Sequence, residues 1–263
     1  MNKTAAILCL WIFPFILPAT GRGQEAVQIP LEKDKIFKNA YVLISESDLY
    51  CSFFVLEDIP AVKIAASEKG GEKSLLSDGD IFYIDRGLES GLAEGQMMTI
   101  LEIGPAVSSQ GAKKRFGPAA FKRGRARIVK LENGRFLARV EKACGEIRVG
   151  DSLVPFEEKE GILGNDLGYQ ASVQVDEAAT GRIVFLDEQF VQIGPGQWAL
   201  IDLGRDSGIQ FGQQLTVFHE YGKGLPPEAV ANVIVIDAGR FTSTIKVLSA
   251  KDAVKIGDLV QVK

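Results

Sequence analysis

The sequence has 263 residues, of which 46% are hydrophobic and 24% charged, an ordinary globular composition with enough apolar residues for two small cores. Its formal net charge of −4 argues against a protein dedicated to nucleic-acid binding, because such proteins carry an excess of basic residues.

The amino terminus predicts a secretory signal peptide over residues 1–23. One basic residue, Lys3, precedes an uncharged apolar run at Ala5–Leu17, and small residues follow at Ala19–Gly21. The apolar run is too short to remain as a permanent membrane span. We therefore expect an exported protein, periplasmic or envelope-associated, without a transmembrane span in its mature form. A polar lead-in or tether would occupy residues 24–40.

Signal cleavage would leave two cysteines, Cys51 and Cys144, because Cys9 lies inside the apolar run. Exported proteins retain disulfides, and a bridge that closes so long a loop would contribute roughly 4–5 kcal/mol in the chain-entropy model. Two buried free thiols are the alternative, since cysteine packs as a small hydrophobe. Both cysteines lie in strand-like runs, LYCSFFVL and ARVEKACGEI, which suit either interpretation.

From Tyr41 onward the chain consists of short apolar runs rich in Val, Ile, Phe and Tyr, separated by Gly, Asp, Asn and Pro. Runs of this length and punctuation are typical of strands in a sandwich or a barrel. Only Glu57–Ser67 could equally be helix or strand. The pattern predicts an all-β protein.

One strand–turn–turn–strand block occurs twice, at Ile81–Glu102 and at Trp198–Glu220. Each copy carries three glycines at a spacing of four, which are Gly87, Gly91 and Gly95 in the first and Gly204, Gly208 and Gly212 in the second. Such spacing could mark helix contacts, but that needs a long apolar helix, which is missing. The glycines therefore predict two successive tight turns in which positive φ is required.

The similarity continues beyond this block. Gly134-Arg135-Phe136 matches Gly239-Arg240-Phe241, and Ala138 then matches Ser243. After two extra residues, a turn before a closing strand matches as well, with Gly150 and Asp151 in the first copy and Gly257 and Asp258 in the second.

These matches predict an internal duplication that produces two tandem small β-barrel or sandwich-like domains. The first domain would span residues 41–157 and the second residues 176–263. The intervening residues 158–175 have the acidic run and glycines of a linker.

Four aspartates recur at these turns: Asp85, Asp202, Asp151 and Asp258. They could be paired acids or calcium ligands. Retention in both copies is explained more simply by a shared turn, because Asp commonly accepts bonds from nearby backbone N–H groups.

No other pattern of catalytic or metal-binding residues stands out. The single histidine, His219, ends a predicted strand, and no cysteine or histidine motif has metal-ligand spacing. Ser90 and Ser207 lack a nucleophile elbow, and the glycine blocks lack the Gly-Lys-Ser/Thr of a phosphate loop. We expect no metal, no cofactor and no enzymatic activity. A hydrolase would need an acid or base pair outside the repeated turns.

The segment KKRFGPAAFKRGRAR is the most unusual local feature. It combines seven basic residues with two aromatic ones and contains no acid: Lys113, Lys114, Arg115, Lys122, Arg123, Arg125 and Arg127, with Phe116 and Phe121. In an exported acidic protein, anionic envelope material is a more natural partner for it than nucleic acid. The alternative is a solvated loop between strands.

Two aromatic residues of the second half, Trp198 and Tyr221, could form a platform for a sugar ring. Core packing of Trp198 at the start of its strand is the alternative.

The string GD-I-x-Y-I-x-x-G-x-x-x-G-x-x-x-G and the later EIRVGDSLVPF resemble β-rich modules of exported bacterial envelope proteins, which often follow a LysM peptidoglycan-binding domain. The resemblance is weaker to the carboxy-terminal domain of the flagellar assembly protein T family. It covers about residues 60–157 and 180–263, and it rests on turn glycines. No LysM segment and no amino-terminal flagellar domain is recognisable here. The resemblance implies modules without catalytic residues.

Together these features predict an exported, non-enzymatic structural or assembly module of the bacterial envelope. Its partner would be an envelope protein, peptidoglycan or another anionic envelope component. The alternative is a ligand-binding module for cell-wall glycan or anionic lipid that acts through residues 113–127.

Overall fold

The computed structural model describes residues 41–70, 73–86, 91–109, 114–169, 180–187, 190–222 and 225–263. The expected signal peptide (1–23) and tether (24–40) lie outside the described residues, as do Gly87 and Lys113. The described residues all belong to one compact unit.

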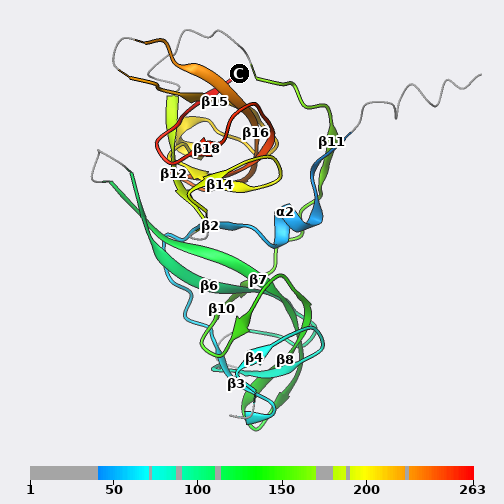
Figure 1. Cartoon of the computed structure of the whole chain (residues 1–263). Helices are drawn as coiled ribbons and strands as arrows, with labels where there is room; N and C mark the ends of the chain where they lie inside the picture. Colours follow the sequence, from blue (N-terminus) through cyan, green and yellow to red (C-terminus); the bar gives the residue numbers. More distant parts are fainter. Residues whose placement is uncertain are drawn as a thin grey trace, which may run out of the picture. The chain divides into compact units, whose positions relative to one another are not determined.

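The prediction of an all-β protein is confirmed (Figure 1). The described residues contain one short α-helix, α2 (Glu46–Tyr50), and one 3-10 turn, η4 (Arg205–Ser207). Within the ambiguous stretch, Ile64–Ser67 is a strand. Cys51 was expected in a strand, but it is the C-cap residue of α2.

The first half of the chain forms one seven-stranded sheet, called here the first sheet. Its strands follow the order β3 (Ile64–Ser67), β5 (Ile81–Ile84), β8 (Arg135–Ala143), β7 (Arg115–Glu132), β6 (Met97–Ser108) and β10 (Ser152–Pro155), and β2 (Phe53–Val55) also pairs with β7. An isolated bridge joins Lys63, the residue before β3, to Ser152 of β10. The sheet encloses a core that includes Phe82, Ile100 and Phe136.

The second half forms a closed six-stranded barrel, called here the second barrel. Its order is β12 (Thr180–Leu186), β14 (Trp198–Ile201), β17 (Ser243–Ala250), β16 (Glu228–Ala238), β15 (Gln214–His219) and β19 (Leu259–Val262), which returns to β12. Its core is almost purely aliphatic and includes Ile201, Val233 and Ile245.

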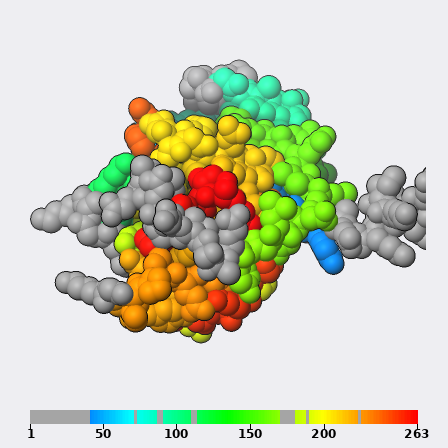
Figure 2. Space-filling view, turned by 90° about the horizontal axis from the view of Figure 1, so that it is seen from above, coloured from blue at the N-terminus to red at the C-terminus, as the bar shows by residue number. Residues whose placement is uncertain are grey.

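Three two-stranded sheets complete the fold. Each region has one at its end, β4 (Leu75–Leu76) with β9 (Ile147–Arg148) and β13 (Gln192–Ile193) with β18 (Val254–Lys255). The third pairs β1 (Tyr41–Ile44) with β11 (Ile162–Gly164), so the expected linker contains a strand. Figure 2 shows the second barrel in yellow, orange and red, with the light-green connecting segment beside it. There Gln214 bonds to the backbone of Asn165 and Leu167.

The same turn bonds occur in both regions. The amide of Gly95 donates to the carbonyl of Ile128, and the amide of Gly212 donates to that of Val235. The φ angles of the two glycines are +82° and +79°, a region that disfavours side chains. Gly91, Gly208, Gly150 and Gly257 also have positive φ. The expectation of a positive φ is wrong for Gly204, whose φ is −132°. A Cβ there would lie 2.4 Å from the carbonyl oxygen of Arg240, so close approach explains this glycine.

The pairing of strands corrects one part of the sequence alignment. Phe82 is opposite Ala138 in the first sheet, and Ala199 is opposite Ile245 in the second barrel. The structural counterpart of Ala138 is therefore Ile245, and the match to Ser243 is out of register by two residues. The local identity of Gly134-Arg135-Phe136 with Gly239-Arg240-Phe241 therefore does not give the register of the strands that follow.

Candidate functional site

The basic segment does not form the loop expected from the sequence. Residues from Arg115 onward belong to strand β7, which pairs with β6, β8 and β2. Four of its basic side chains form ion pairs with acids on other elements, and these are Lys122–Asp237 at 3.4 Å, Arg123–Glu102 at 2.5 Å, Arg125–Glu46 at 2.9 Å and Arg127–Glu141 at 2.9 Å. Acids distant in the sequence thus neutralise most of the segment.

Its aromatic residues are packing residues. Phe121 is buried, with its ring centroid 5.5 Å from that of Phe53, and Phe116 is half-buried in the same cluster. Lys114 and Arg115 are exposed, and Lys114 lies over the rings of Phe116 and Phe241. Lys113 is outside the described residues. The exposed basic part of the segment is therefore small.

Two apolar clusters join the first half of the chain to the second barrel, and we call this contact the junction. One includes Phe53, Val107 and Phe121 on the first side and Val184 and Leu200 on the second. The other packs residues of β1 and α2 against β16. Strands β6 and β7 reach the barrel because they are long, with 12 and 18 residues. Their counterparts in the strand order of the second barrel, β15 and β16, have 6 and 11 residues.

A buried ion pair lies in the junction. The ammonium of Lys246 is 2.6 Å from the Asp48 carboxylate, which also accepts from the Trp198 indole N–H at 2.9 Å. Asp48 closes the capping box of α2 with Ser45. Burial alone would raise the pKa of Asp48, but the bonds from Lys246, Ser45 and Trp198 together hold it below its usual value. Asp48 therefore connects α2 to the barrel as an ionised group.

A second charged cluster lies beside the first. The ammonium groups of Lys122 and Lys159 both lie 3.4 Å from the same carboxylate oxygen of Asp237. Lys122 also donates to the carbonyl of Leu49 at 2.8 Å. Burial lowers the pKa of Lys122, and Asp237 partly opposes this shift. Two ammonium groups thus share one carboxylate in a partly buried environment.

This cluster opens into a cleft of about 1120 Å³. One wall comes from α2, β2, β7 and β10, and the other from residues 205–211 and the end of β16. Its apolar lining includes Leu49, Phe54, Leu56, Val154, Ile209 and Phe211. A concave, mixed apolar and charged surface of this kind is the strongest candidate for a binding site in the described residues.

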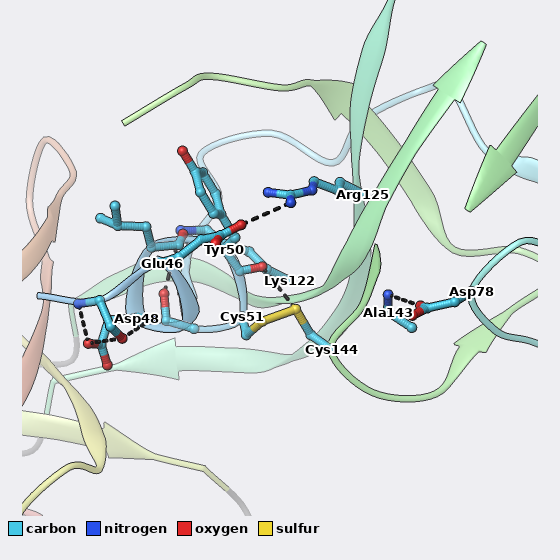
Figure 3. The surroundings of a disulfide bond; sticks show 12 residues. Glu46, Asp48, Tyr50, Cys51, Asp78, Lys122, Arg125, Ala143 and Cys144 are labelled. Atoms are coloured by element: carbon cyan, nitrogen blue, oxygen red, sulfur yellow. Dashed lines mark hydrogen bonds and ion pairs between the residues drawn. A yellow bond between two sulfur atoms is a disulfide. The ribbon is translucent and has the colours of Figure 1, made fainter. Parts of the chain in front are cut away.

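The structure joins Cys51 and Cys144 by a disulfide, with their Cα atoms 5.3 Å apart (Figure 3). The bond ties the end of α2 to the residue after β8. Figure 3 shows Glu46 of the same helix directed to Arg125 of β7, so α2 is held to the first sheet at both ends.

The repeated aspartates accept backbone hydrogen bonds in both regions. Asp85 and Asp202 accept from the amides of Lys63 and Arg182, which are 22 and 20 residues away, so the expectation of a bond to a nearby amide is wrong for these two. Asp151 and Asp258 accept from amides three residues before them, at 2.8 and 2.7 Å. Burial raises the pKa of Asp151 and of Asp258 above the usual value. Each acid lies in its own turn, so the four do not converge on one site.

His219 is buried, with Nδ1 2.7 Å from Asp258 and Nε2 3.8 Å from Asp252. Tyr221 lies against the edge of the His219 ring, whereas Trp198 packs into the junction, so the proposed sugar platform is not assembled. Ser207 lies in η4, and Ser90 is outside the described residues.

Among the described residues, no group of three or more His, Cys, Asp or Glu side chains could hold a metal ion. No described helix has the length and apolar character needed to cross a membrane.

Comparison with known proteins finds no family model and no curated protein that matches this chain.

Proposed function

We propose that this chain is an exported, non-enzymatic assembly or interaction module of the bacterial envelope. In this proposal two copies of one β module, produced by internal duplication, are fixed against each other and present a composite surface to a partner. The observation that carries it is the junction, where two apolar clusters and the buried Asp48–Lys246 pair connect the two regions.

The arrangement of acidic residues supports a role without catalysis. The repeated aspartates accept backbone hydrogen bonds. The ionised Asp48 accepts from three donors, Lys246, Ser45 and Trp198. Export is supported by the signal-like amino terminus and by the Cys51–Cys144 disulfide, because such bonds persist in oxidising compartments.

The alternative, binding of glycan or anionic lipid through the basic segment, has less support. The ion-paired side chains of the segment would have to leave their acids to bind an anion. Within the described part of the segment, only Lys114 and Arg115 are exposed basic residues without a described acidic partner. The test must therefore change those two residues alone.

The experiment is cross-linking and affinity capture from native envelope extract, after fractionation to establish where the protein resides. Three proteins are compared: the wild type, Lys246→Met at the junction, and the Lys114→Ser/Arg115→Ser pair. We expect the wild type and the Ser pair to capture the same envelope protein, and the junction variant to lose it. Capture of glycan or lipid that the Ser pair abolishes would favour the alternative, and residence in the cytoplasm would contradict both.

A further inference from the structure

Two residues that line the cleft, Asp237 and Phe211, stand at positions where the two regions differ. The amides of Ile128 and Val235 donate to the carbonyls of Gln96 and Gln213, so they are structural counterparts. Two residues further on, Asp237 of the cleft corresponds to Lys130, which is exposed and pairs with Glu132. Shared positions are explained by the shared fold, whereas a difference of this kind points to a local role.

The wall formed by residues 205–211 also contains a position at which the two regions differ. In the ungapped alignment of the repeated block, Phe211 corresponds to Glu94. Phe211 is 41% exposed although it is a large apolar side chain in a turn, and it faces a cleft whose opposite wall includes Phe54 and Leu56. A ligand with an apolar body would remove these apolar surfaces from water, which favours binding.

The charged floor of the cleft has an excess of cations. Lys122 and Lys159 share the Asp237 carboxylate at 3.4 Å each, which is longer than the usual 2.7–2.9 Å of a charge-assisted hydrogen bond. Lys122, Lys159 and Asp237 expose 10%, 35% and 19% of their side-chain surface. One further negative charge would balance this group, whereas a dianion would leave an excess beside Asp237.

The rim adds charges of both signs. Arg205, Glu157 and Glu160 line it and are exposed, and Glu157 lies 4.0 Å from Lys159 with 80% of its side chain exposed. Because water and salt screen exposed charges, the floor rather than the rim decides which head group is favoured.

We infer that the cleft binds an elongated apolar molecule with a single carboxylate, the chemistry of a fatty acid. The carboxylate lies between Lys122 and Lys159, and the apolar chain extends between Phe54 and Phe211. The cleft, about 1120 Å³, is slightly larger than the roughly 300–1,000 Å³ typical of small-molecule sites, so its volume is sufficient for such a chain.

The test is isothermal titration of the purified protein with decanoate below its micelle concentration, alongside 1-decanol and decyltrimethylammonium. We expect saturable one-to-one binding of decanoate, binding of the alcohol at least about tenfold weaker, and no saturable binding of the cation. Failure of decanoate to saturate, or equal affinity for the alcohol, would overturn the inference.

Variants locate the site. Lys159→Met should weaken decanoate binding about tenfold, and Phe211→Ser about fivefold, as expected for loss of one ionic and one apolar contact. The matched controls are Lys130→Met, an exposed lysine of the first sheet, and Phe190→Ser, which is 43% exposed outside the cleft. Lys122 is left intact because it also bonds to the backbone of α2.

The controls should bind within twofold of the wild type, and all four variants should keep its thermal unfolding midpoint within a few degrees. Equal binding by the cleft variants and the controls would place decanoate elsewhere and refute the site. This outcome is separate from that of the envelope capture, which uses the junction and Ser-pair variants.

Discussion

The first sheet and the second barrel have the same strand order and the same turn bonds, yet they differ in their outer contacts. Counterpart positions hold the turns in both, as with Gly95 and Gly212. The counterpart of Lys246 is Arg139, because each lies opposite the first residue of the equivalent strand, Trp198 or Ile81. Arg139 is exposed, whereas Lys246 is buried at the junction. The comparison teaches that residues common to both regions hold the turns, whereas Lys246 of the junction and Asp237 and Phe211 of the cleft are specific to the second barrel.

The disulfide belongs to one region only and should show the largest effect. Cys144 corresponds to Lys251, since their amides donate to the carbonyls of Arg123 and Val230. The Cys51→Ser/Cys144→Ser double variant should lose roughly 4–5 kcal/mol of unfolding free energy, because the bridge spans 93 residues of sequence. Urea unfolding measures this loss, and dithiothreitol should destabilise the wild type but not the variant. Equal stability of the two proteins would show that the bridge does not constrain the chain.

Lys246→Met should cost about 3–5 kcal/mol, because it leaves the Asp48 carboxylate buried without its cation. Arg139→Met changes the counterpart on an exposed face and should stay within about 0.5 kcal/mol. Urea unfolding of both variants checks the contrast. If the two costs were equal, the distinction between scaffold and junction would fail at this pair.

Gly95→Ala and Gly212→Ala should each cost about 1–2 kcal/mol, because both residues have φ near +80°. The second should cost slightly more, since its Cβ would lie 2.6 Å from Cδ1 of Ile162 in the connecting segment. Thermal unfolding provides the measurement. A negligible cost at either position would mean that this turn relaxes and is not part of a common scaffold.

Asp151→Asn and Asp258→Asn should have the smallest effects, below about 1 kcal/mol at pH 7, because asparagine can still accept the turn hydrogen bond. Their raised pKa values mean that the folded state holds the proton more tightly than the unfolded state. These carboxyls therefore stabilise the fold at acid pH relative to neutral pH, and the contribution falls as pH rises through the folded pKa.

Each Asn variant should remove that pH dependence, and the two should do so alike. Stability measured from pH 3 to pH 7 tests this. If stability changed with pH in opposite directions in the two variants, the two turns would differ. His219, which lies beside Asp258, would be the first residue to test as the cause.

The sequence is informative where the structure is local. Short alternating runs give the all-β class, and the repeated glycines, with Asp151 and Asp258, lie at turns because each turn is built from residues close in the chain. The hairpin match failed because Phe136 and Phe241 are locally similar while the ladder sets the register.

The junction and the cleft could not be predicted in the same way. The acids that pair with the basic segment come from positions as distant as Glu46 and Asp237, and no local pattern announces them. Asp48 and Lys246 are separated by 198 residues in the sequence, and only the tertiary structure brings them together. The available signal was the difference between the two regions at counterpart positions, such as Asp237 against Lys130, and using it requires the correct register of the strands.

The most direct test of the account is native-state hydrogen exchange at the counterpart amides of Ile128 and Val235, measured over a urea series. If the junction couples the two regions, the two amides should open with the same free energy in the wild type and with different free energies in Lys246→Met. Different opening free energies in the wild type would contradict the claim that the junction makes the two regions one cooperative unit.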